Sequence, residues 1–176
     1  MNFPIRPRRN RRTPAIRNLV RETTLSPADF ILPLFLHEDA EDTPIASMPG
    51  VTRWSLDGLV KEVGEAHALG INAVVLFPKI EESLKTPFAE ECYNDEGLIP
   101  RAILALKEAY PSLCVITDVA LDPYNSDGHD GVVARDGLGE LHILNDETVA
   151  ILVEQAICHA RAGACLLSTS PSPRDS

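Results

Sequence analysis

Residues 73–78 read Ala73-Val-Val-Leu-Phe-Pro78, an unbroken apolar run that is typical of a parallel strand covered on both of its faces. Just before this run, apolar residues at helical spacing predict an amphipathic helix that Ser55 caps and Gly70 ends. Still earlier, Phe30-Ile-Leu-Pro-Leu-Phe-Leu36 predicts another buried strand, and Pro33 indicates a position beside a sheet edge. This strand–helix–strand order predicts a parallel βα unit with a right-handed crossover.

The same order continues toward the C-terminus. The further predicted elements are a helix that Pro100 opens and that stops before Pro111, a strand over Cys114–Leu121, a helix between its cap Asn145 and Gly163, and a strand that starts at Ala164–Leu167. In the last helix, a stripe of apolar residues at helical spacing should face the core: Val149, Leu152, Val153, Ala156, Ile157 and Ala160. Alternating strands and helices predict an α/β protein.

The connecting segments differ in length according to the element they follow. Those from helix to strand are short, near 70–73, 110–114 and 163–164, whereas those from strand to helix are long, at 37–55, 79–98 and 122–145. Ligands of parallel α/β folds bind at the carboxyl ends of the strands, so the long segments predict an active site on that face. The sequence holds no glycine-rich phosphate-binding motif, which leaves a barrel or an open sheet that binds no nucleotide.

The charge of the chain is unevenly distributed. The formal net charge is -10, yet residues 1–22 hold seven arginines and only one acidic residue, Glu22. The acidic remainder disfavours nucleic acid as the main partner and is usual for a soluble enzyme. We interpret the basic arm as a docking segment for an acidic partner subunit, with a solvated tail as the alternative.

The sequence also bears on the compartment. Its longest apolar stretch, Phe30–Leu36, is too short to span a bilayer, and no secretory signal is recognisable. The four cysteines, at 92, 114, 158 and 165, include no C-x-x-C pair, which predicts core thiols in a reducing compartment. We therefore expect a cytoplasmic protein with no membrane partner.

Acidic side chains gather in and after the strand at 114–121. Asp118 lies within an apolar strand, where a carboxylate is costly unless it is paired or protonated. Asp122, Asp127 and Asp130 crowd the following loop together with His129, and such oxygen-rich clusters suit hard ions such as Mg²⁺. Plain turn residues are the alternative. An EF-hand is excluded because its loop would need ligands where proline and alanine stand.

Several motifs of the sequence occur in the same order in one enzyme family. They are Pro7-Arg-Arg-Asn-Arg-Arg12, Phe30-Ile-Leu-Pro-Leu-Phe35, Ser47-Met-Pro-Gly-Val51, Leu76-Phe-Pro78, Gly97-Leu-Ile-Pro-Arg101, Thr117-Asp-Val-Ala-Leu-Asp-Pro-Tyr124, Asp127-Gly-His-Asp-Gly131 and Leu144-Asn-Asp-Glu-Thr148. Over roughly residues 5–164 the sequence resembles porphobilinogen synthase, also called 5-aminolevulinate dehydratase. The motif at 117–124 is the most specific of the set.

The resemblance implies a fold and a reaction. The fold is the N-terminal part of a TIM (β/α)8 barrel with an extended N-terminal arm that wraps a neighbouring subunit, commonly in a homo-octamer. The reaction, catalysed by a lyase, condenses two 5-aminolevulinate molecules into porphobilinogen, an early step of tetrapyrrole and heme synthesis. The implied division of the chain is an arm over 1–28, three βα units over 29–164, and a Ser/Pro-rich end over 165–176 that we interpret as not native.

The resemblance also implies site residues. Asp118 matches an active-site aspartate of the family. Zinc-using members carry cysteines where Ala120, Asp122 and Asp130 stand here, and since carboxylates suit harder ions than thiolates do, the sequence resembles the zinc-independent, magnesium-type branch. Asp122 and Asp130 are thus the candidate metal ligands.

Two departures from the family limit what the chain is expected to do. The family's two Schiff-base lysines come from later strands and have no match here, and we interpret Lys79 as a surface lysine. The βα pattern is lost within the fourth strand, which suggests a truncated gene product that is inactive alone. The alternatives are a non-catalytic half-barrel that binds full-length subunits, and another metal-dependent α/β enzyme that uses the acidic loop.

Overall fold

A computed structural model describes residues 8–135, 137 and 140–168 of the chain. Within these residues the main sheet has six strands in the spatial order β2 (Thr43–Pro44), β3 (Thr52–Trp54), β1 (Ile31–Leu36), β4 (Ala73–Pro78), β5 (Cys114–Asp118) and β8 (Leu166–Ser168). All neighbours are parallel except β2, which runs antiparallel to β3. The connecting helices are α2 (Leu56–Ala68), α3 (Leu98–Ala109) and α4 (Asn145–Ala162). The α/β prediction is confirmed.

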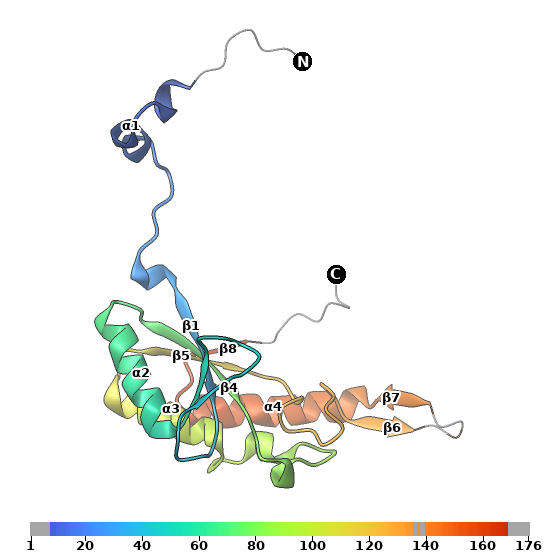
Figure 1. The fold of residues 1–176 in the computed structure, drawn as a ribbon. Coiled ribbons are helices and arrows are strands. Elements are labelled where there is room, and N and C mark those ends of the chain that lie inside the picture. The colour runs from blue at the N-terminus through green and yellow to red at the C-terminus, as the bar shows by residue number, and fades with distance from the viewer. Residues whose placement is uncertain (1–7, 136, 138–139, 169–176) are drawn as a thin grey trace, which may run out of the picture.

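The arm extends away from this body (Figure 1). It holds the short helices η1 (Arg9–Arg11), α1 (Pro14–Leu19) and η2 (Pro27–Asp29), none of which has a buried residue. Thr13 caps α1, because its hydroxyl accepts a hydrogen bond of 3.2 Å from the backbone N–H of Ile16. The sequence analysis did not predict these helices, since no apolar stripe marks them.

Pro33 lies where the sequence placed it, beside an edge. The carbonyl of Leu36 accepts from Lys79 on the β4 side, whereas the N–H of His37 donates to Trp54 on the β3 side. The backbone N–H and C=O groups of successive residues point alternately to the two neighbouring strands, so the backbone nitrogen of Pro33 is on the β3 side. The pairing of β1 with β3 begins only at Phe35. The missing N–H of Pro33 therefore costs no ladder hydrogen bond.

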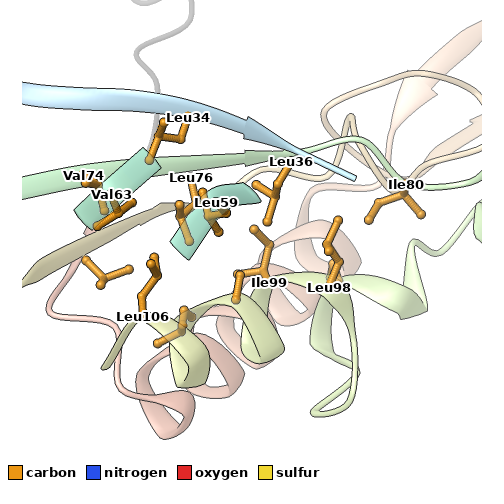
Figure 2. Close-up of a cluster of buried hydrophobic side chains, with 14 of the residues drawn as sticks. Leu34, Leu36, Leu59, Val63, Val74, Leu76, Ile80, Leu98, Ile99 and Leu106 are labelled. Atoms are coloured by element: carbon orange, nitrogen blue, oxygen red, sulfur yellow. The ribbon is translucent and has the colours of Figure 1, made fainter. Parts of the chain in front are cut away.

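The core lies between the main sheet and the helices on one of its faces. Figure 2 shows side chains of β1 and β4, among them Leu36 and Leu76, meeting those of α2 and α3, among them Leu59 and Ile99. Only one face of β4 is fully buried, because Val74 and Leu76 alternate with residues that are partly exposed. The prediction that this strand is covered on both faces is therefore wrong within the described residues.

Several predicted boundaries shift by a few residues. Helix α3 begins at Leu98, since Gly97 has an extended backbone, and Pro100 falls in the first turn, where no N–H is needed. Strand β5 ends at Asp118 rather than Leu121, because the carbonyl of Leu121 accepts two turn hydrogen bonds from Tyr124 and Asn125. Asn145 is the first residue of α4 and not its cap, and β8 begins at Leu166.

The buried face of α4 differs from the predicted one. Val149 and Val153 are each 50% exposed and Ile157 is 44% exposed. The fully buried positions of the helix are instead Thr148, Gln155, Cys158 and His159. The prediction is wrong for these three residues and for Ala160, which is also exposed, because the helix turns a largely polar face toward β5 and the loops that precede it. Leu152 of the predicted stripe is partly buried and packs against the core.

The segment at 122–144, interpreted from the sequence as a long loop, contains a hairpin. Strands β6 (Val133–Arg135) and β7 (Leu141–Ile143) pair in antiparallel register and project beside the start of α4 (Figure 1). Two further short helices, η3 (Glu82–Leu84) and η4 (Glu90–Tyr93), lie in the segment between β4 and α3. The predicted non-native end lies outside the described residues from 169 onward.

Helices within the described ranges are each too short or too polar to cross a membrane.

Candidate functional site

A cavity of about 220 Å³ lies at the carboxyl ends of β1, β4 and β5. The residues that line it are Phe35, Phe77, Pro78, Asp118, Ala120, Asp122, Pro123 and Tyr124. All three strands run parallel, so their carboxyl ends meet at one edge of the sheet. The cavity therefore occupies the face that the long strand-to-helix segments indicated.

Two aromatic rings form the apolar wall of this cavity. Phe35 and Phe77 are paired in register on β1 and β4, and their ring centroids lie 5.6 Å apart. Side chains alternate along a strand, so these rings face away from Leu36 and Leu76, which lie in the core. The sequence analysis missed both, although the alternation within each strand could have identified them.

Asp118 is the last residue of β5 and lines the cavity. Its neighbour Thr117 is fully buried on the opposite side of the strand, toward the helices. Alternation thus places the Asp118 carboxylate beside the aromatic wall, at the point where the strand opens into its loop. The structure therefore places this predicted residue within the candidate site.

The predicted acidic residues gather at the rim. Ala120 and Asp122 line the cavity, whereas Asp130 does not. Desolvation raises the pKa of the Asp122 carboxyl above its usual value, and the nearby charges of Asp130 and Asp118 raise it further. Asp122 is therefore close enough to Asp130 and to Asp118 for both charges to repel its own.

The described residues include no cluster of three or more His, Cys, Asp or Glu side chains arranged to hold a metal. The donor chemistry nevertheless suits a hard cation, since Mg²⁺ is usually bound by one or two carboxylates and keeps several waters. Asp122 and Asp130 supply carboxylate oxygens, and neither contributes the thiolate that zinc prefers. Asp127 has a turn role, because its N–H donates to the side-chain oxygen of Asn125 over 2.6 Å.

Asn125 fastens together the two loops that border the cavity. It is 1% exposed, and its side-chain N–H groups donate to the carbonyls of Pro87 at 3.0 Å and Gly131 at 3.4 Å. Its backbone also forms a bridge with Thr86. No pattern in the sequence indicates this contact, because Asn125 and Pro87 are distant in the chain.

Two lysines follow β4. Lys79 is exposed, as expected from the sequence, and its backbone N–H donates to Leu36. Lys85 forms an ion pair of 2.7 Å with Glu82, and its charge partly offsets the raised pKa of Asp122. Lys85 is thus a positive group near the acidic rim that the sequence analysis did not single out.

The cysteines lie away from the cavity lining. Cys92 and Cys158 are buried, and desolvation raises the pKa of their thiols to about 12 and about 11. The prediction of core thiols is confirmed for these two residues and is wrong for Cys165, which is exposed.

Comparison with known proteins decides the family. The sequence profile of delta-aminolevulinic acid dehydratase matches residues 4–173. The chain belongs to this family. It is 56% identical over 167 residues to the chloroplastic delta-aminolevulinic acid dehydratase of Glycine max, which covers 94% of this chain. It is 58% identical over 161 residues to that of Pisum sativum, which covers 90% of this chain. The chain spans 39% of the length of each of these relatives.

A solved structure shows the same fold. The delta-aminolevulinic acid dehydratase (porphobilinogen synthase) of Toxoplasma gondii ME49, crystallised with its reaction product porphobilinogen, superposes with a TM-score of 0.88 at 52% identity. The match covers 96% of this chain and 47% of that one. The predicted family and fold class are confirmed: the described residues form the N-terminal part of a TIM barrel.

Proposed function

We propose that this chain supplies one wall of the active site of a delta-aminolevulinic acid dehydratase, which condenses two 5-aminolevulinate molecules into porphobilinogen. The observation that carries the proposal is the cavity at the carboxyl ends of the barrel strands, in a fold that matches the porphobilinogen-bound relative at a TM-score of 0.88. Barrel enzymes carry their active sites on this face.

The cavity wall suggests what the chain contributes. Phe35 and Phe77 exclude water from one side of a bound substrate, which strengthens polar interactions on the other side. Asp118, beside them, can accept a hydrogen bond from an amino group of 5-aminolevulinate or hold a proton there. The Schiff-base lysines that the family resemblance implies have no match in this sequence, so the chain alone lacks the covalent part of the mechanism.

A magnesium ion fits the rim of the site. Asp122 and Asp130 would hold it, because a divalent cation would offset the desolvation of the Asp122 carboxylate and the repulsion by Asp130 and Asp118, which together raise the pKa of Asp122. When bound, the ion would supply positive charge that orients a carboxylate group of the substrate. Calorimetric titration of the chain with MgCl₂ should give a binding isotherm that Asp122→Asn abolishes and Asp127→Asn retains, whereas equal loss in both variants would count against this site.

The assembly and the compartment are further proposals. The basic arm, whose arginines are exposed over residues 8–22, suits docking on the acidic surface of a second subunit, and the octamer implied by the family resemblance is the assembly we propose. Cytoplasmic location stays a prediction from the sequence, although the relatives from Glycine max and Pisum sativum are named as chloroplastic. A fluorescent fusion imaged in its own cells would distinguish the cytoplasm from a plastid.

The test of the function compares the chain alone with a joined protein. Residues 1–168 are fused to the part of the Glycine max enzyme that follows its match to this chain, and both proteins are incubated with 5-aminolevulinate. We expect porphobilinogen from the joined protein and none from the 176-residue chain above a heat-killed control. An inactive joined protein that folds and assembles would contradict the proposed function. Turnover by the chain alone would contradict the need for the missing lysines.

A second candidate is a non-catalytic half-barrel that associates with full-length subunits. The observation that favours it is the partly exposed inner face of the sheet, where Phe35, Val75 and Phe77 are available for contact. Co-expression of the chain with the Glycine max enzyme should then yield mixed assemblies with altered activity. Separate elution of the two proteins would eliminate this candidate.

A further inference from the structure

Helix α4 turns two polar side chains inward where it packs near the carboxyl end of β5. Gln155 is fully buried and His159 is 1% exposed, although both residue types are commonly found at least partly exposed. The two residues are four positions apart and therefore lie on one face of the helix. Burial of such groups is costly unless they form hydrogen bonds, so the contacts they make matter.

Both side chains bind the end of β5. The Nδ1 atom of His159 and the hydroxyl of Thr117 form a hydrogen bond of 3.0 Å. The Nε2 atom of Gln155 donates to the carbonyl of Ala120 over 3.1 Å. Between these points, the N–H of Val119 donates to the carbonyl of Ser168 on β8 over 2.7 Å. Residues 117–120 are thus held at three points.

The other side of the same segment lines the cavity. Asp118 and Ala120 contribute to the cavity wall, while Thr117 points toward α4. The two hydrogen bonds from α4 therefore hold the residue before Asp118 and the residue two positions after it. Any shift of Thr117 or Ala120 would move the Asp118 carboxylate relative to the aromatic wall.

The choice of polar residues on this face points to a role beyond packing. Val149, Val153 and Ile157 are available on α4 and would bury apolar area, yet each is about half exposed. Besides Cys158 and the partly buried Ile151 and Leu152, the helix buries groups whose hydrogen bonds have a direction. Burial lowers the pKa of His159 to about 4, so its ring is uncharged at neutral pH and acts through its hydrogen bond.

We propose that Gln155 and His159 are positioning residues, which fix Asp118 and Ala120 in the cavity wall through Thr117 and the Ala120 carbonyl. The inference rests on the proposed function for its catalytic consequence, whereas the local rigidity it requires can be measured without any activity. His159→Asn can place an amide nitrogen near the position of Nδ1, so this variant should retain the hydrogen bond to Thr117 that His159→Leu removes.

The first experiment measures amide hydrogen exchange of residues 117–124 in the 176-residue chain. His159→Leu should accelerate exchange of Val119–Leu121 about fivefold to tenfold, the effect of losing one buried hydrogen bond, and His159→Asn should stay near the wild-type rate. Cys158→Ala is the matched control. Cys158 is buried on the same helix, but its side chain interacts with Cys92 and Asp95. Equal acceleration of exchange in His159→Leu and Cys158→Ala, or no acceleration in His159→Leu, would overturn the proposal.

The second experiment places the same variants in the joined protein. His159→Leu should lower kcat/KM for 5-aminolevulinate about tenfold, with restoration by His159→Asn and a change within about twofold for Cys158→Ala. Normal kcat/KM in the leucine variant would contradict the positioning role. If the joined protein makes no porphobilinogen at all, the proposed function fails, and the exchange data still decide whether α4 holds the segment.

Discussion

At the scale of single residues, the ionised carboxylate of Asp122 is less favourable in the folded chain than in the unfolded chain. Its pKa is raised in the folded protein, so the unfolded chain releases this proton first as the pH rises. The stabilisation by protonated Asp122 is therefore present below pH 3.8 and is lost as the pH rises through the folded pKa. At neutral pH, we therefore expect the charge of Asp122 to lower the free energy of unfolding of the chain.

This reasoning gives a prediction for Asp122→Asn. The variant should unfold with a free energy up to about 1 kcal/mol higher than wild type at pH 7, and the difference should vanish near pH 3. Denaturant unfolding at both pH values measures it. Asp127→Asn is the control, because it removes one charge from the same loop without altering the cavity lining. An equal gain in the free energy of unfolding in both variants would mean that the lower net charge of the chain, and not the position of Asp122, causes the effect.

His159 predicts a pH dependence of the opposite sign. Burial lowers its pKa from 6.5 to about 4, so the unfolded chain takes up a proton first as the pH falls. Stability should decrease between pH 6.5 and 4 by at most about 1.4 kcal/mol per pH unit from this residue.

His159→Asn should remove that part of the slope in denaturant unfolding. His142→Asn, which makes the same substitution at an exposed position of β7, is the control. A wild-type slope in the His159 variant would show that the ring does not remain neutral in the folded protein.

At the scale of elements, the apolar periods in the sequence predicted most of the βα order but not which face of α4 is buried. The periodicity of Val149, Val153 and Ile157 indicates a helix correctly, since it records the helical repeat. It cannot reveal that Gln155 and His159 find hydrogen-bond partners at Ala120, just after β5, and at Thr117 on β5, 35 and 42 residues earlier in the chain. Burial of a polar residue depends on its partner, and the partner is set by the fold.

The same limit applies to the candidate site. Asp118 could be predicted because a carboxylate inside an apolar strand is unusual by itself. Asn125 and Lys85 could not, because their importance depends on contacts between two loops that become neighbours only in the folded chain. The hairpin β6–β7 was missed since its strands are only three residues each, too short for an alternating pattern to show.

Helix α2 illustrates a prediction that both sequence and structure support. The hydroxyl of Ser55 accepts from the N–H of Gly58 at 3.0 Å and donates to Asp42 at 2.8 Å. Ser55→Ala should lower the free energy of unfolding by about 1 to 2 kcal/mol, through loss of the cap and of the hydroxyl that donates to Asp42.

Thr13→Ala provides the matched control for this cap. Thr13 caps α1 in the same way, but α1 has no buried residue. Loss of this cap should therefore leave the unfolding midpoint of the body unchanged. Equal destabilisation by the two variants in thermal unfolding would mean that the arm packs on the body in solution.

At the scale of the whole molecule, the described residues bury one face of the main sheet and leave the other partly open. The helices cover the face that carries Leu36 and Leu76, whereas Phe35, Val75 and Phe77 on the inner face remain partly exposed. In a closed barrel that inner face is filled by side chains from all strands. Phe35 and Phe77 of this partly exposed face line the cavity, which is why we assign this chain one wall of a site.

The open face and the strand edges predict self-association of the 176-residue chain. Ile31 is 54% exposed and Leu166 is 56% exposed, and β8 is an end strand of the described sheet. Unpaired edges next to apolar surface favour association between copies. Light scattering after gel filtration should give a mass above 19.2 kDa that rises with concentration. Leu166→Lys should reduce this mass, whereas Leu104→Lys, at an equally exposed position on α3, should not. A constant monomeric mass with one sharp cooperative melt would contradict the prediction and would mean that the partly open half-barrel is stable without a partner.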